Sequence, residues 1–103
     1  MRSILIVGAG RSSAALVRYL LEKSFSEELK VIIADISVEN AKKLVKGHEN
    51  AAIVELDIFN IESRKALVNS ADIVISMLPA RFHLEIAKDC LAFGKSLVTA
   101  SYI

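Results

Sequence analysis

Residues 4–13 read I-L-I-V-G-A-G-R-S-S, and this short stretch decides the fold. The run from Ser3 to Val7 shows no alternation between apolar and polar positions, which favours a parallel strand covered on both faces. The glycines interrupt that run, and residues 11–24 then carry apolar side chains at helical spacing. We therefore expect a strand, a glycine turn and a helix, in that order.

The same alternation continues along the rest of the chain. Further strands are expected at 30–34, 51–56, 72–76 and 96–99, and further helices at 38–46, 61–69 and 81–93. Ser37 and Asn60 are of the residue types that cap helix N-termini. Right-handed crossovers between parallel neighbours place helices on both faces of a sheet. We predict a three-layer α/β domain with a doubly wound parallel sheet of about five strands in the order 3-2-1-4-5, the Rossmann fold.

The composition narrows the class of protein further. With 103 residues there is room for one domain, and a net charge of +1 gives no field strong enough to hold nucleic acid or a membrane surface. One cysteine forms no internal disulfide, so we expect a cytoplasmic domain. The apolar share of 53% predicts a sheet buried on both faces, with further apolar surface covered by a partner domain or in a homodimer. Because the sequence stops just after the fifth predicted strand, we expect residues 1–103 to be a cofactor domain followed by a substrate domain.

The glycine turn has the pattern of a phosphate-binding loop. Gly8 allows a tight turn, and Gly10 leaves space for a pyrophosphate at the helix N-terminus, where the helix dipole favours an anion. The third position of the pattern holds Ser13, where glycine or alanine is usual, and its hydroxyl or that of Ser12 is placed to donate to a phosphate oxygen. Arg11 belongs to the same turn and is included in the predicted cofactor site. The alternative is a tight turn that binds nothing.

An acid follows the second predicted strand at the spacing that such sites require. Asp35 ends the run V-I-I-A-D and lies 22 residues beyond Ser13 (35 − 13 = 22), close to the expected ~20. A carboxylate there can accept both hydroxyls of an adenosine ribose and repels a 2′-phosphate, and Ile36 supplies no positive charge. We therefore predict NAD rather than NADP as the cofactor. The alternative is a solvated acid near the start of the next helix.

Weaker signals lie after the later strands. Asp57 follows the third strand and is placed either to reach the adenine amino group or to be an ordinary exposed turn residue. Leu78 and Pro79 follow the fourth strand, where backbone groups would lie near the nicotinamide ribose. His83 is placed either to face the active site or, as is more common for a lone histidine at a helix start, to be polar surface, and we expect Cys90 to be an inert core thiol. The sequence predicts no metal site.

Three stretches together resemble the N-terminal part of the saccharopine dehydrogenase family. They are I-L-I-V-G-A-G-R near the start, V-I-S-M-L-P-A-R-F-H at 74–83 and L-V-T-A-S-Y-I at 97–103. The resemblance implies an oxidoreductase of lysine metabolism in which a nicotinamide cofactor exchanges hydride with the C–N bond of a secondary amine that links two amino-acid moieties. By motif match, Ser101 and Tyr102 would lie beside the nicotinamide or the substrate, and the turn from Pro79 to His83 would flank the same crevice. Asp35 stands where NADP-preferring members commonly carry a basic residue, which again favours NAD.

The resemblance also limits the activity expected of residues 1–103 on their own. The family's substrate domain and most of its acid–base residues lie beyond residue 103, so we expect no catalytic residue in this chain. One alternative is a stand-alone nucleotide-sensing module, as in the regulatory domains of potassium transport systems, although Ser101 and Tyr102 have no evident use there. Another is a Rossmann-like domain that has lost its ligand.

Overall fold

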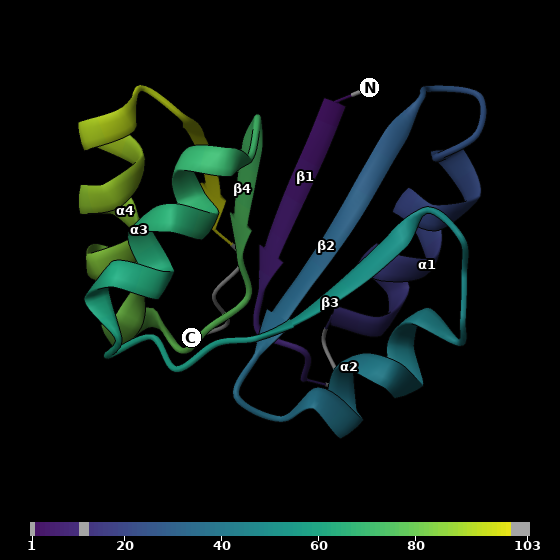
Figure 1. The fold of residues 1–103 in the computed structure, drawn as a ribbon, viewed down its shortest axis with the longest axis horizontal. Helices are drawn as coiled ribbons and strands as arrows, with labels where there is room; N and C mark the ends of the chain where they lie inside the picture. The colour runs from purple at the N-terminus through teal and green to yellow at the C-terminus, as the bar shows by residue number, and fades with distance from the viewer. Residues whose placement is uncertain (1, 11–12, 100–103) are drawn as a thin grey trace.

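A computed structural model of the chain describes residues 2–10 and 13–99. The elements are β1 (Arg2–Val7), α1 (Ala14–Lys23), β2 (Leu29–Asp35), α2 (Val38–Val45), β3 (Ala51–Glu55), α3 (Ile61–Ser70), β4 (Ile73–Ser76), α4 (Ala80–Phe93) and β5 (Ser96–Thr99). The strands form a five-stranded sheet in the order β3-β2-β1-β4-β5, and every pairing is parallel (Figure 1). The predicted doubly wound fold and its strand order are confirmed.

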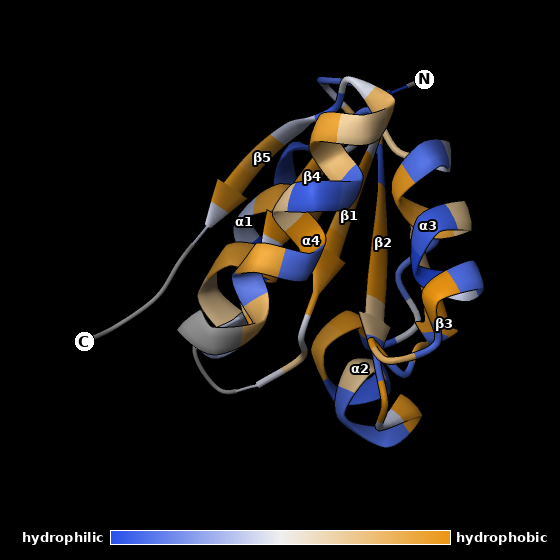
Figure 2. Ribbon diagram, turned by 90° about the vertical axis from the view of Figure 1, so that its left-hand side faces the viewer, coloured by the Kyte–Doolittle hydropathy of each residue, from blue (hydrophilic) through white to orange (hydrophobic). Residues whose placement is uncertain are grey.

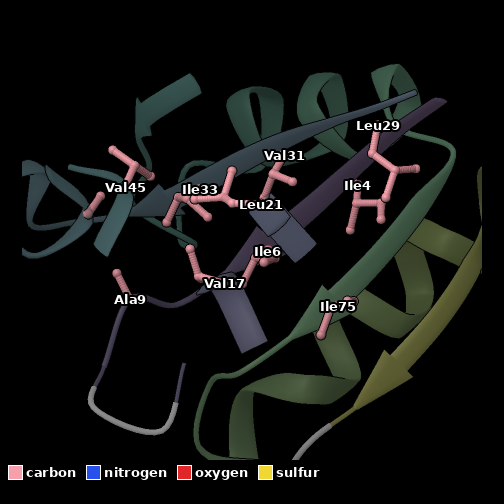
Figure 3. Close-up of a cluster of buried hydrophobic side chains, with 11 residues drawn as sticks. Ile4, Ile6, Ala9, Val17, Leu21, Leu29, Val31, Ile33, Val45 and Ile75 are labelled. Atoms are coloured by element: carbon pink, nitrogen blue, oxygen red, sulfur yellow. The ribbon is translucent and has the colours of Figure 1, made fainter. Parts of the chain in front are cut away.

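The apolar runs of the central strands are continuous because both faces of the sheet are covered. Helices α1 and α2 lie on one face, and α3 and α4 lie on the other (Figure 1). Successive side chains of a strand point to opposite faces, so Ile4 and Ile6 pack with α1 and α2 whereas Leu5 and Val7 pack on the other side. Figure 3 shows the first of these clusters, with Val17 of α1 among the strand side chains.

Local signals set the helix ends. The side chain of Ser37 accepts the N–H of Asn40, and the side chain of Asn60 accepts the N–H of Ser63, so both predicted N-caps are confirmed. Helix α4 ends at Phe93, and its C-cap is Gly94, whose φ of 66° is the left-handed conformation that glycine adopts at least cost.

A buried ion pair joins the two helices on the second face. The guanidinium of Arg64 on α3 bonds the carboxylate of Asp89 on α4, and both side chains are buried. Arg64 also donates to the carbonyl of Ile58 at 2.8 Å, in the loop before α3. The pair therefore ties α4 to the loop that follows β3.

The edges of the sheet are less well covered than its centre. Val98 on β5 is exposed, and so is Leu91 on α4, at 85%, although its spacing from Ile86, Ala87 and Cys90 in the sequence predicts one shared apolar face for all four; that prediction is wrong for Leu91. In Figure 2, β5 forms the left-hand edge of the sheet. Among residues 2–10 and 13–99, no helix combines the length and apolar character needed to cross a bilayer.

Candidate functional site

The first glycine of the turn after β1 is required by the fold itself. Gly8 has a φ of 106°, and a Cβ there would lie 3.2 Å from the carbonyl carbon and oxygen of Met77. Its N–H donates to the carbonyl of Ala34 at 2.8 Å. Backbone conformation and the close approach of the chain after β4 therefore both select glycine at position 8.

Gly10 has no such structural reason. A Cβ built on it would meet no described atom within 4 Å, and its φ lies outside the left-handed range. The residue is also exposed. Because neither packing nor backbone conformation demands glycine here, the bare Cα leaves open space beside the start of α1, as a bound phosphate would need.

Ser13 closes the far end of the turn. Its buried hydroxyl donates to the carbonyl of Gly8 at 2.9 Å, and its N–H donates to the carbonyl of Gly10 at 3.0 Å. The hydroxyl, expected as a donor to a phosphate oxygen, thus uses its one proton inside the turn. Arg11 and Ser12, also predicted in this turn, lie outside the described residues, as do Ser101 and Tyr102.

Asp35 connects the loops that follow three strands. One carboxylate oxygen accepts the N–H of Ala9 at 2.6 Å, and the other accepts the N–H of Ser37 at 2.7 Å. Its main-chain carbonyl accepts the N–H of Leu56 at 3.0 Å. The acid is therefore bonded to the glycine turn, to the loop before α2 and to the end of β3.

A cavity of about 280 Å³ lies at this edge of the sheet, just below the ~300–1,000 Å³ of common small-molecule sites. Five of the predicted cofactor residues line it together: Gly8, Asp35, Asp57, Leu78 and Pro79. A larger cleft of about 560 Å³ lies between α1 and α2, but none of the predicted site residues lines it. The smaller cavity is thus the one that coincides with the glycine turn.

Two aromatic residues lie at this cavity that the sequence analysis did not name, although Phe82 falls within the turn from Pro79 to His83 that the resemblance implies beside the crevice. Phe59 and Phe82 both line it, and their rings meet edge to face with centroids 5.9 Å apart. Phe59 is also 73% exposed, so much of its ring is open to contact from the cavity side. For Phe59 the only local signal was an aromatic residue in the loop after a predicted strand, which is too common to single out.

Asp57 is partly committed to its own loop. Its Oδ1 accepts the N–H of Phe59 at 2.9 Å, which is an Asx turn. The residue is exposed and borders the cavity, so contact with an adenine amino group stays a prediction.

Of the two interpretations of His83 on α4, the polar surface residue is the one that the structure contradicts. Nδ1 of His83 lies 2.8 Å from Oγ of the fully buried Ser76, and its Nε2 is buried without a hydrogen-bond partner among the described residues. The expectation is wrong because the start of α4 packs on the end of β4, where the serine hydroxyl supplies a partner. Cys90 is buried as predicted, and burial, with a smaller contribution from the carboxylate of Asp89, raises the pKa of its thiol. Among the described residues, no cluster of three or more metal-ligand side chains is found.

A doubly wound parallel sheet with a glycine turn between its first strand and first helix defines a domain of the Rossmann class. Within that class, the chain belongs to the saccharopine dehydrogenase family. The sequence model of the protein family described as "Saccharopine dehydrogenase NADP binding domain" matches residues 4–102. The resemblance seen in the three sequence stretches is therefore confirmed.

Individual relatives agree with this assignment. The chain is similar to an alpha-aminoadipic semialdehyde synthase of Arabidopsis thaliana, with 36% identity over 117 residues that cover 97% of this chain and 11% of the relative. It is also similar to a saccharopine dehydrogenase [NADP(+), L-glutamate-forming] of Pyricularia oryzae, with 31% identity over 102 residues, 99% of this chain and 22% of the relative. Among solved structures, a saccharopine dehydrogenase (L-Glu forming) from Saccharomyces cerevisiae has the same fold, with a TM-score of 0.87, 24% identity and coverage of 100% of this chain and 22% of that one. The chain thus spans 11% to 22% of the length of these relatives.

These findings overturn the predicted cofactor preference. The family description names NADP, and the fungal relatives carry NADP(+) in their names. NADP is therefore favoured over NAD, and the prediction of NAD is wrong. The structure adds contacts that the prediction did not consider, because each oxygen of the Asp35 carboxylate accepts one backbone N–H.

Proposed function

We propose that this chain binds NADP along the turn between β1 and α1 and serves as the cofactor domain of an oxidoreductase. The observation that carries the proposal is Gly10, a glycine with open space where its side chain would be and no need for a left-handed backbone. The NADP named in the family description and in the fungal relatives supports the choice of dinucleotide.

The described residues would bind and orient the cofactor. The start of α1 would face the phosphates, because the N-terminus of a helix carries unpaired N–H groups and a partial positive charge. The cavity beside it offers an apolar surface from residues such as Ile58 and Phe59, suited to the adenosine part. Leu78 and Pro79 would lie beside the nicotinamide ribose of the dinucleotide. The bound dinucleotide supplies the hydride acceptor or donor.

For the whole protein, we infer hydride transfer at the C–N bond of a secondary amine that joins two amino-acid moieties. The names of the relatives, saccharopine dehydrogenase and alpha-aminoadipic semialdehyde synthase, support this substrate class. Transfer requires the reacting carbon to be held ~3–3.5 Å from the nicotinamide. This domain would contribute the cofactor side of that geometry.

Calorimetric titration of the purified chain tests the binding step. We expect saturable binding of NADPH with one site per chain, weaker binding of NADH, and stabilisation against unfolding of about 2.7 kcal/mol when NADPH is at about 100 times its dissociation constant. No heat and no stabilisation at millimolar NADPH would refute the proposal.

The chemistry is tested with the full-length protein. Loss of the reduced-nicotinamide absorbance should require both an amino acid that bears an aldehyde and a second amino acid that supplies the amine. Oxidation of NADPH that needs only one of the two, or none with any such pair, would contradict the inferred substrate class.

A further inference from the structure

Asp35 occupies a position where an acid ordinarily binds the adenosine ribose of the cofactor. Its contacts here point to a different task. Both carboxylate oxygens accept backbone N–H groups, from Ala9 at 2.6 Å and from Ser37 at 2.7 Å. Hydrogen bonds to an ionised carboxylate are the stronger kind, and at these lengths neither bond is incidental.

The bond to Ala9 completes the anchoring of the glycine turn. Gly8 is held against the chain after β4, and Ser13 ties the other end of the turn to the Gly8 carbonyl. Ala9 lies between them and is only 5% exposed, so its N–H has little access to water and needs a partner inside the protein. The Asp35 carboxylate is that partner.

The bond from Ser37 connects the loop between β2 and α2 to the same carboxylate. Ser37 caps α2, and the carbonyl of Asp35 holds the N–H of Leu56 at the end of β3. One residue therefore fixes the relative positions of the chain segments that follow β1, β2 and β3, all of which line the cavity of about 280 Å³.

We propose that Asp35 is a positioning residue that holds the glycine turn in its cofactor-binding shape, and that it does not select between NAD and NADP. The inference rests on the proposed function, because it concerns how the same cofactor site is built. Two N–H dipoles direct their positive ends at the carboxylate, which lowers the field that the acid presents to a 2′-phosphate nearby.

Binding of both cofactors to Asp35→Ala tests the proposal. We expect the dissociation constants of NADPH and NADH to rise together, by about tenfold, so that their ratio changes by less than about threefold. A ribose ligand would behave differently: NADH would weaken alone, while NADPH would be unaffected or bind more tightly. That outcome would overturn the proposal, and so would unchanged affinity for both.

Asp72→Ala is a matched control. The Asp72 carboxylate likewise accepts a backbone N–H across strands, from Ser3 at 2.7 Å, but at the opposite end of β1 from the glycine turn. This variant removes one backbone bond of the same kind at an exposed position, and it should keep both dissociation constants. Equal losses of affinity in the two variants would show a general effect of destabilisation and overturn the proposal.

A measurement without cofactor separates this inference from the proposed function. Amide hydrogen exchange at Ala9 and Ser37, followed by NMR, should accelerate in Asp35→Ala and not in Asp72→Ala; unchanged exchange at both amides would overturn the inference. A wild-type chain that binds neither dinucleotide would refute the proposed function, but the exchange rates of the Ala9 and Ser37 amides would still test the role of Asp35. If Asp35→Ala does not fold, Asp35→Asn keeps one acceptor oxygen, and it should weaken both cofactors equally by a smaller factor.

Discussion

Substituting Gly10 by alanine should separate cofactor binding from folding. The added methyl group enters open space, and position 10 needs no left-handed φ. Folding should therefore be unharmed, and the free energy of unfolding should rise by up to about 0.4–1 kcal/mol because alanine restricts the unfolded chain. The same methyl group would stand where the phosphates approach the start of α1.

The expected loss of affinity follows from the hydrogen bonds at stake. A bond from a backbone N–H to a charged phosphate contributes about 1.5–3 kcal/mol, so displacing the phosphates from one such donor should weaken NADPH binding by about 10- to 100-fold. Gly8→Ala is the contrasting variant, since its Cβ would lie 3.2 Å from the Met77 backbone at a φ of 106°. That strain should cost about 1–3 kcal/mol of stability.

Two measurements on each variant separate an effect on folding from an effect on cofactor binding. Urea unfolding gives the change in stability, and calorimetric titration with NADPH gives the change in affinity. Gly10→Ala should be stable and bind poorly, whereas Gly8→Ala should be less stable. If Gly10→Ala bound NADPH as tightly as the wild type, the space beside position 10 would not be the phosphate site, and the argument for the cofactor would fail.

Three further outcomes are expected. The N–H of Ser3 is the main cause that lowers the pKa of Asp72. The advantage of the wild type over Asp72→Asn in urea unfolding should therefore be fully present at pH 7, begin to shrink near the ordinary aspartate pKa of about 3.9, and be lost as the pH falls through the lowered pKa of the folded state; an advantage that persists at still lower pH would contradict this. Arg64→Met leaves Asp89 buried without its partner and should cost about 3–5 kcal/mol in denaturant unfolding, and a loss below 1 kcal/mol would be inconsistent with a buried pair. Asn60→Ala removes the cap of α3 and should cost about 1 kcal/mol in thermal unfolding, whereas no change would mean that the cap adds nothing.

The fold was predictable because its signals are local. Continuous apolar runs such as Ser3–Val7 indicate strands covered on both faces, and the residues at Ser37 and Asn60 mark helix starts without reference to the rest of the chain. The right-handed crossover rule then leaves few ways to order the strands. Within the site, Gly8 and Asp35 were identified for the same reason, as each follows directly from the end of a strand.

The contacts of the site residues could not be predicted in this way. Asp35 bonds an amide 26 positions away, and that pairing exists only because the ends of β1 and β2 meet at one edge of the sheet. His83 finds Ser76 because α4 packs back on the strand before it. The presence of an acid after the second strand was therefore visible in the sequence, whereas its hydrogen-bond partners were not.

The exposed outer strand has a practical consequence for anyone who purifies this domain. Within the described residues, β5 pairs with β4 alone, and its other side presents backbone donors and acceptors beside the exposed Val98. Such a border is a template on which another chain can add by backbone pairing, and an apolar side chain next to it strengthens the attachment. Concentrated samples should therefore self-associate, and a lysine at position 98 is a simple means of keeping them monodisperse.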